Sequence, residues 1–397
     1  MGDKTPKDLY SDEISLIPPT GSREFIELNL KQILKRRRQF NIPVIGIAGS
    51  DGKTTTKRMI SAILSSFYNI LETPMQCVTT AGLTSTILQL NEKHEIALWE
   101  LGIVEPEQFE WAVRVAQPNI AVVTNIGEAH LAKNGDKYLI ANTKVELVRR
   151  LPKDGYAVLN IDDELVSWMA SFAPTPNVIK FGLNKNATFN ANNIEHLGPD
   201  GIVFTVNGYY KFHLPIYTSA LIYNALAAIA VARIFNIEFP DIQRTLQKNF
   251  SVLPHRGNLI KTDDFFILDH TYDATINSVT KACESLVQFK RFSKKVVLVI
   301  GDISNPGPAP KEIHQKMGYY IAALPIDVVV TIGKYATYIA KGIKQMNHTK
   351  KTIVACRNTS TALKKLQEIL SPQSTLLFIG SQQLALYNLL EEFLQQV

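Results

Sequence analysis

The sequence is poor in cysteine. Only three cysteines occur among 397 residues, Cys77, Cys283 and Cys356, and no two of them form a CxxC pair. This spacing excludes a zinc site built from cysteine pairs and a small disulfide scaffold, and it is typical of a reducing cytoplasm. We therefore expect a cytoplasmic protein in which the three thiols are packing residues.

Long apolar runs are absent as well, and so is a strong charge of either sign. No stretch of about 18 apolar residues occurs, and the charged N-terminus lacks the apolar core of a secretory signal, so no membrane span or membrane partner is expected. Lysine and arginine total 42 against 36 aspartate and glutamate, a net charge of +6. This excess suits an anionic small molecule at least as well as nucleic acid. Because aromatic and basic residues are not interleaved, we expect no nucleic-acid partner.

The chain does contain enough apolar material for more than one core. Hydrophobic residues make up 46% of the sequence, and the length suggests two or three domains at roughly 150 residues each. We predict a short N-terminal extension over residues 1–41 that ends in a helix. A central domain over residues 42–252 and a C-terminal domain over residues 253–397 are predicted to follow.

Both predicted domains alternate short apolar strands with amphipathic helices, which is typical of a parallel sheet covered by helices. In the central domain we predict strands at residues 44–48, 96–101, 120–125 and 157–161, then a β-rich stretch over 178–215 and a helix over 223–235. In the C-terminal domain we predict strands at residues 265–268, 296–300, 328–332, 352–355 and 376–379. The predicted fold class is therefore α/β.

The strongest motif follows the first strand. The segment over residues 49–56 reads GSDGKTTT and leads into an amphipathic helix. Small residues let backbone N–H groups face a phosphate, and the helix N-terminus adds partial positive charge. Lys53 can reach the outer phosphates, and the Thr54 hydroxyl can bind Mg²⁺. The strict GxxxxGK[ST] spacing is not met, because Ile47 occupies the first glycine position.

A plain glycine turn between a strand and a helix is the alternative, but the context favours a phosphate loop that binds ATP. The central domain is therefore predicted to be a P-loop-type ATPase domain with a mostly parallel sheet, and the C-terminal domain to be Rossmann-like. The loop residues predicted to contact the nucleotide are Gly49, Ser50, Asp51, Gly52, Lys53, Thr54 and Thr55.

From this loop onward the chain resembles the Mur ligase family, ATP-dependent amide ligases that build the peptide of bacterial cell walls. It is most similar to the branch that adds D-alanyl-D-alanine. The matching segments, in order, are Glu100-Leu101-Gly102, the TNIGEAHL segment over residues 124–131, Lys144-Val145-Glu146-Leu147, Asn224-Ala225-Leu226, His255-Arg256-Gly257, the segment over residues 269–278, and Gly301-Asp302. The resemblance covers residues 42–397.

The resemblance implies that ATP phosphorylates a substrate carboxylate and that the amine of an amino acid or peptide attacks the acyl phosphate, releasing ADP and phosphate. Positioning and charge neutralisation would carry such a reaction. It further implies Lys53, Glu100, His130 and Lys144 as catalytic residues, and two Mg²⁺ ions held by Thr54, Glu100, His130 and a carbamylated Lys144. It places Asn224, Arg256 and Asp269 at the nucleotide.

Several departures from the family pattern leave the substrates open. Only about forty residues precede the phosphate loop, so we expect this chain to lack the usual N-terminal UDP-binding domain. Ile379 and Gln382 stand where the family has a lysine and an arginine, beside Gly380-Ser381. The first hypothesis is an active amide ligase with a non-standard substrate. The second is a nucleotide-binding subunit that is non-catalytic or depends on a partner protein.

Overall fold

The computed structural model describes residues 23–75, 79–103, 105–127, 136–304, 306–346 and 350–396. It divides into two compact units. Unit 1 comprises Met1–Asn190 and Asn224–Thr245, and unit 2 comprises Ala191–Tyr223 and Leu246–Val397. The predicted domain ranges, with boundaries after residues 41 and 252, stay a prediction. In the described residues no helix is long and apolar enough to cross a bilayer.

Unit 1 is built on a parallel sheet whose central strands are buried along their whole length. The strands, in spatial order, are β2 (Ile70–Glu72), β3 (Ile96–Glu100), β1 (Val44–Ala48), β4 (Ile120–Val123), β5 (Tyr156–Asn160) and β6 (Val178–Gly182), and the first residues of β7 (Phe189–His196) pair with β6. Every residue of β1, β3 and β4 is buried. Continuous apolar runs of this kind form strands that helices cover on both faces.

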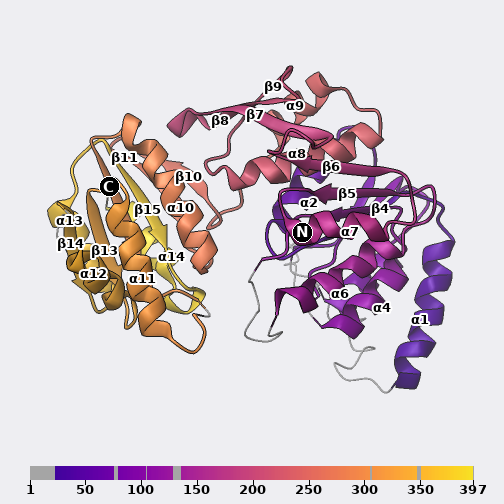
Figure 1. The fold of residues 1–397 in the computed structure, drawn as a ribbon, viewed down its shortest axis with the longest axis horizontal. Helices are drawn as coiled ribbons and strands as arrows, with labels where there is room; N and C mark the ends of the chain where they lie inside the picture. The colour runs from indigo at the N-terminus through magenta and orange to yellow at the C-terminus, as the bar shows by residue number, and fades with distance from the viewer. Residues whose placement is uncertain are drawn as a thin grey trace, which may run out of the picture. The chain divides into compact units, whose positions relative to one another are not determined.

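Alternating side chains of these strands face different helices. Val44 and Ala48 belong to a core formed with helices on one face of the sheet, and the ribbon of Figure 1 shows α4 and α6 on this side. The helices of that face are α1 (Arg23–Arg38), α3 (Thr80–Leu88), α4 (Pro106–Ala116), α6 (Lys137–Arg149) and α7 (Glu164–Met169). Helix α2 (Lys53–Leu64) packs on the other face, and α8 (Ala220–Ile234) and α9 (Phe239–Asn249) complete the helices.

Unit 2 contains a six-stranded sheet and an antiparallel ribbon. The sheet order is β10 (Asn258–Lys261), β11 (Phe265–His270), β15 (Ser374–Ile379), β12 (Lys295–Ile300), β13 (Val328–Ile332) and β14 (Thr352–Cys356), and all pairs except β10 with β11 are parallel. In the ribbon, β8 (Ile202–Val206) lies between the later part of β7 and β9 (Tyr210–Leu214).

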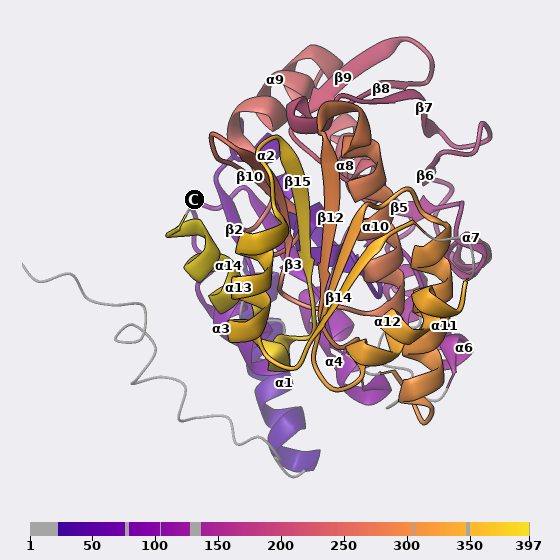
Figure 2. The ribbon, with the colours of Figure 1, turned by 90° about the vertical axis from the view of Figure 1, so that its left-hand side faces the viewer.

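The two faces of the six-stranded sheet carry separate cores. Figure 2 shows α10 (Ile276–Gln288), α11 (Pro310–Ala323) and α12 (Ala336–Gln345) on one face, and α13 (Thr359–Ile369) and α14 (Leu386–Leu394) on the other. Cys283 lies in the first core and Cys356 in the second, so both are packing residues as predicted, while Cys77 lies outside the described residues. Four short 3₁₀ turns, Ala170–Phe172, Gly198–Asp200, Phe289–Phe292 and Gln382–Leu384, complete the chain's described elements.

The predicted strands are confirmed, with small shifts at their ends. The first strand has the predicted bounds. The strand predicted over residues 120–125 ends at Val123, and the Thr124 side chain and Asn125 bind the phosphate loop. Two strands were not predicted. They are β2, which has three residues, and the edge strand β10, which carries Asn258 and Lys261 among its four. In segments of three or four residues the alternation of apolar and polar side chains is too short to distinguish a strand from a loop.

Candidate active site at the phosphate loop

The phosphate loop joins β1 to α2 at the carboxyl end of the unit 1 sheet, and two of its glycines have conformations that a side chain would prevent. Gly52 has φ +79°, and a Cβ there would lie 2.4 Å from Asn224 Nδ2. Gly49 has φ +143°, and a Cβ there would lie 2.0 Å from Thr124 Oγ1. The loop therefore needs glycine at both positions, because only glycine combines these dihedral angles with so close an approach.

The loop is held in shape by the segment that follows β4. The Ser50 N–H donates to Asn125 O at 2.8 Å, and the Asp51 N–H donates to the Asn125 side chain at 2.9 Å. The Thr124 hydroxyl donates to Asp51 O at 2.7 Å. Because these bonds join two neighbouring strands at the same sheet edge, they set the loop's geometry without any ligand.

The Lys53 ammonium lies over the loop that precedes it. Its Nζ donates to Gly49 O at 3.0 Å and to Ser50 O at 2.7 Å. Both acceptors belong to the residues predicted to surround the phosphates. Lys53 therefore lies against the loop that is predicted to bind the phosphates.

Thr54 and Glu100, which were predicted as ligands of one Mg²⁺ ion, are in contact. The Thr54 hydroxyl donates to Glu100 Oε1 at 2.7 Å. Glu100 ends β3 and is 4% exposed, and its second oxygen, Oε2, is buried without a hydrogen-bond partner in the described structure. A buried carboxylate oxygen without a donor is costly unless a ligand completes its surroundings. The pair fits Mg²⁺, a hard cation that prefers carboxylate and hydroxyl oxygens.

Lys144, the residue that the resemblance marks for carbamylation, is buried on α6. It is 5% exposed, donates to Ile103 O, and lies 3.9 Å from the centroid of the Phe109 ring. The pKa of the Lys144 ammonium is lowered to about 7, chiefly by burial and also by the positive charge of Lys53, while Glu105 acts in the opposite direction. A substantial fraction of this amine is therefore neutral near pH 7, and a neutral amine is nucleophilic.

The other predicted residues of unit 1 differ in what the structure says of them. His130 lies outside the described residues. Thr55 lies in the first turn of α2, where the N–H groups of the helix terminus point toward the loop. Asn224 donates to Gly52 O at 3.2 Å and to the Thr56 hydroxyl at 2.9 Å, and its predicted contact with the nucleotide stays a prediction. Its amide therefore supports the loop from α8.

Arg256 and Asp269 belong to unit 2, where Arg256 lies in the loop before β10 and Asp269 lies near the end of β11. The Arg256 guanidinium stacks 3.7 Å from the centroid of the Tyr272 ring, and the ring itself is partly exposed. Asp269 is fully buried, and it accepts hydrogen bonds from the N–H and hydroxyl of Thr271 and from the N–H of His255. Both carboxylate oxygens of Asp269 are thus engaged by the chain itself.

The carboxyl end of β12 is arranged in a similar way. Asp302 Oδ1 accepts from the N–H groups of Tyr335 and Ala336 at 2.8 and 2.6 Å, at the start of α12. His314 Nε2 accepts from the Ile303 N–H at 2.9 Å, and its Nδ1 donates to Pro310 O. Burial lowers the pKa of His314, which keeps the ring neutral for these two bonds.

Several residues that build the site belong to none of the predicted motifs. Lys57, one turn after Thr54, is buried between Glu100 and Thr73. Asn160 donates to Thr124 O, and Asp163 accepts from the Ile126 N–H, so both support the segment that shapes the loop. A signal for Lys57 was present, because its spacing of three and seven residues from Ile60 and Leu64 places a lysine on the apolar face of α2.

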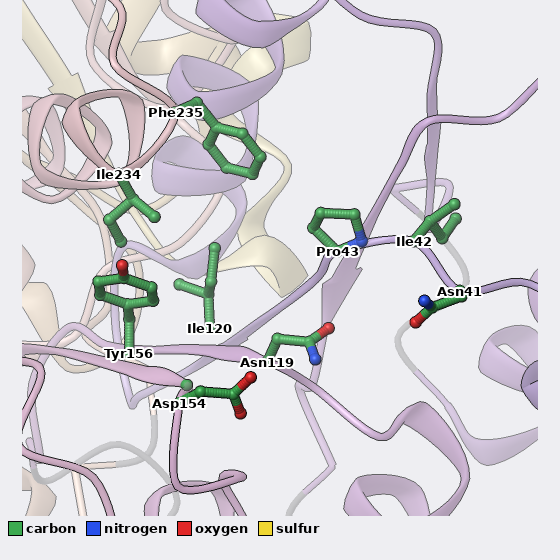
Figure 3. A pocket seen from close by; sticks show the side chains of 10 residues that line it. Asn41, Ile42, Pro43, Asn119, Ile120, Asp154, Tyr156, Ile234 and Phe235 are labelled. Carbon is green, nitrogen blue, oxygen red and sulfur yellow. The ribbon is translucent and has the colours of Figure 1, made fainter.

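The hollow in Figure 3 lies away from this site. It has a volume of about 400 Å³ and is lined by residues that precede β1, β4 and β5, including Pro43, Asn119 and Asp154, together with Ile234 and Phe235 at the end of α8. These residues mark the amino end of the parallel strands, whereas the phosphate loop lies at the carboxyl end. Ligands of open α/β sheets bind at the carboxyl end, so this hollow is not part of the candidate active site.

Comparison with known protein families places both units in one family. The Mur ligase middle domain matches residues 47–232, and the Mur ligase glutamate ligase domain matches residues 255–382. The chain belongs to the Mur ligase family. It is an ATP-dependent ligase that forms amide bonds, as the phosphate loop and the buried Thr54–Glu100 pair lead one to expect.

Individual relatives belong to the branch that the sequence resembles. The UDP-N-acetylmuramoyl-tripeptide--D-alanyl-D-alanine ligase of Bacillus subtilis is 31% identical over 370 residues, which is 92% of this chain and 79% of the relative. A crystal structure of MurF from Acinetobacter baumannii is 26% identical with a TM-score of 0.82, and the match covers 94% of this chain and 81% of that one. The MurF ligase of Thermotoga maritima in complex with ADP, at 23% identity, shares the fold with a TM-score of 0.80 over 96% and 87% of the two chains.

Proposed function

We propose that this protein joins the amine of a dipeptide to the carboxylate of a cell-wall peptide precursor, at the cost of one ATP. The relatives are named for D-alanyl-D-alanine as the amine and a UDP-N-acetylmuramoyl-tripeptide as the acid, so these are the first substrates to test. The observation that carries the proposal is the Thr54–Glu100 pair with its unpartnered buried oxygen, next to the loop that holds Lys53. We place the reaction in the cytoplasm, where ATP is available.

In this proposal the loop binds and orients the triphosphate. The N–H groups at the start of α2 and the Lys53 ammonium contact the phosphate oxygens, and Lys53 gives up its bonds to Gly49 O and Ser50 O in exchange. Thr54 and Glu100 hold one Mg²⁺ ion, which when bound with ATP neutralises phosphate charge. With the phosphates held in place, the acid carboxylate can attack the terminal phosphorus, and the amine then displaces phosphate from the acyl group.

Lys144 supplies a second anionic ligand once it is carbamylated. Its neutral amine, favoured by the pKa of about 7, forms an N–C bond to CO₂ and loses one proton. The product replaces a cation with an anionic oxygen group, which can hold a second Mg²⁺ together with His130. Carbon-13 NMR in labelled bicarbonate should show a carbamate signal in the native protein. A Lys144→Met variant that kept the same signal would contradict this assignment.

The remaining predicted residues have supporting roles in the proposal. Asn224 holds the loop through its bonds to Gly52 and Thr56, and a contact of Arg256, which stacks over Tyr272, with phosphate stays a prediction. Asp269 positions the loop that carries Arg256, because its oxygens accept from His255 and Thr271. A direct contact of Asp269 with the nucleotide stays a prediction.

The test is phosphate release from ATP with pooled acids and amines, followed by mass spectrometry of the product. Turnover should require both substrates and should be lost in Lys53→Ala, while the exposed Lys93→Ala variant serves as a matched control. A product joining the tripeptide precursor to D-alanyl-D-alanine would establish the substrates. If ATP were turned over only with other acids, the protein would still be a ligase, but the proposed substrates would be wrong.

A second candidate is a nucleotide-binding subunit that needs a partner protein. The observation in its favour is that Asp269, Asp302 and His314 all bond to the chain's own backbone, which leaves few free groups at that sheet edge of unit 2 for an amine substrate. Nucleotide binding without turnover by the isolated chain, together with a stable partner that restores turnover, would favour this candidate over the first.

A further inference from the structure

Lys57 is a buried cation beside the proposed magnesium site, and the proposed reaction does not use it. Its side chain is 1% exposed, and its Nζ lies 3.9 Å from Glu100 Oε2. The same Nζ donates to Thr73 O, at the residue that follows β2. A lysine is almost never fully buried unless it is paired, so its position beside Glu100 calls for a role.

Lys57 and Glu100 are connected in a second way through Thr73. The Glu100 N–H donates to the Thr73 hydroxyl at 2.9 Å, while the Thr73 carbonyl accepts from Lys57. Thr54 contacts the other carboxylate oxygen, Oε1, at 2.7 Å. The carboxylate is thus approached by a hydroxyl on one oxygen and by a cation near the other, with its backbone fixed to the same threonine.

The distance between Lys57 Nζ and Glu100 Oε2 shows that Lys57 compensates the carboxylate charge without a hydrogen bond to this oxygen. At 3.9 Å the Lys57 ammonium is too far from Oε2 for a hydrogen bond, and this oxygen has no other donor in the described structure. The charges still attract strongly, because burial reduces screening by water. Lys57 therefore offsets the carboxylate charge while it leaves the acceptor capacity of the buried Oε2 unused.

We propose that Lys57 is a positioning residue that offsets Glu100 in the absence of nucleotide and makes the site unattractive to a free divalent cation. The inference rests on the proposed metal role of Glu100. A divalent ion that arrives alone meets one carboxylate already balanced by an ammonium. An ion that arrives with a triphosphate brings several negative charges with it, and these outweigh the repulsion from Lys57. The site thereby accepts the ion together with its nucleotide.

The experiment measures the binding of Mn²⁺ alone to the full chain, by electron paramagnetic resonance, without nucleotide. In Lys57→Met, Mn²⁺ should bind at least about tenfold more tightly than in the native protein, because the opposing charge is gone. Lys57→Arg should retain the weak binding. Arg58→Met is the matched control, since it removes one charge from the adjacent position of α2 and Arg58 has no ion pair with Glu100; it should change Mn²⁺ affinity much less.

Thermal unfolding with and without Mn²⁺ gives a second readout that a merely structural role would not move. The stabilisation by Mn²⁺ should be larger for Lys57→Met than for the native protein, and Lys57→Gln, which keeps a donor toward Thr73 O, should behave in the same way if Lys57→Met does not fold. Equal or weaker Mn²⁺ binding in the folded variants would overturn the inference. If Glu100→Gln bound Mn²⁺ and Mn²⁺–ATP as the native protein does, the proposed metal site itself would fail.

Discussion

The carboxyl ends of the two parallel sheets carry comparable polar residues but use them differently. In unit 1 two buried groups of the candidate site are not fully compensated by the chain. Glu100 has a buried oxygen without a donor, and Lys144 is buried with its pKa lowered to about 7. Such groups destabilise the folded chain unless a ligand completes them.

In unit 2 the groups at the corresponding edge are satisfied by the chain itself. Asp269 accepts from Thr271 and His255, and Asp302 accepts from two N–H groups at the start of α12. The comparison indicates that the unit 1 edge is prepared for a charged ligand, whereas the polar residues of the unit 2 edge first serve its own loops. Substitutions should therefore affect catalysis in unit 1 and stability in unit 2.

The largest effect is expected from Lys53→Ala. Removal of this ammonium takes away a contact that matters most when phosphate charge develops, and a loss of about 10³-fold in ATP turnover, or ~4 kcal/mol, is expected. The free energy of unfolding should change little, because the two carbonyls that Lys53 contacts can be hydrated. Turnover assays and urea unfolding on the same preparation check both parts. A variant that lost stability but kept its ATP turnover would contradict the view that Lys53 serves the ligand and not the fold.

The next largest effect is expected from Asp269→Ala in unit 2. It leaves the donors of Thr271 and His255 buried without their acceptor, which should lower the free energy of unfolding by about 3 kcal/mol. All three tryptophans lie in unit 1, so circular dichroism should report this loss while tryptophan fluorescence reports the unit 1 transition. Asp269→Asn, which keeps the shape and part of the acceptor capacity, should be intermediate. If Asp269→Ala weakened ATP binding at full stability, Asp269 would contact the nucleotide directly.

A smaller effect is expected from Asp302→Ala. The carboxylate caps the first N–H groups of α12, and loss of such a cap costs about 1–2 kcal/mol. Chemical denaturation followed by circular dichroism measures it, and Asp302→Asn should recover part of the loss. An unchanged midpoint together with a raised KM for the amine would instead assign Asp302 to substrate binding.

The smallest effect is expected in the pH dependence of unit 2. Burial lowers the pKa of His270 to about 4, against a weaker opposite influence of Asp269. The unfolded chain binds this proton more readily, so the contribution of His270 is complete above its ordinary pKa of about 6.5 and is lost as the pH falls toward 4. At pH 5.5 the native protein should lose about 1 kcal/mol more than His270→Gln, relative to pH 7. If the free energy of unfolding changed with pH in the same way in both proteins, His270 would not be the source of the pH dependence.

Much of the unit 1 site could be predicted from the sequence because its parts are local. The loop over residues 49–56 follows a buried strand and opens a helix within a single stretch of chain, so spacing alone places Lys53 and Thr54 at the loop. Glu100 could be placed at the same edge because it ends a neighbouring parallel strand. The Mur ligase resemblance then supplied its partners, and the family assignment was confirmed.

The supporting residues could not be predicted in the same way. Thr73 follows a three-residue strand that the pattern does not show, and Asn160 and Asp163 act on residues nearly forty positions away. Asn224 contacts a loop that lies 172 positions earlier in the chain. Contacts of this kind depend on which strands become neighbours, and no single segment carries that information.

By itself, then, the sequence determined the order of strands and helices, the phosphate loop and the family, because periodicity and short motifs are encoded in adjacent residues. Only the tertiary structure decided which buried charged groups lack a full set of partners. It placed Lys57 against Glu100, lowered the pKa of Lys144 through burial, and saturated Asp269 within its own loops. Hydrogen-bond satisfaction and desolvation depend on every group that surrounds a side chain, and packing assembles those groups from distant parts of the chain.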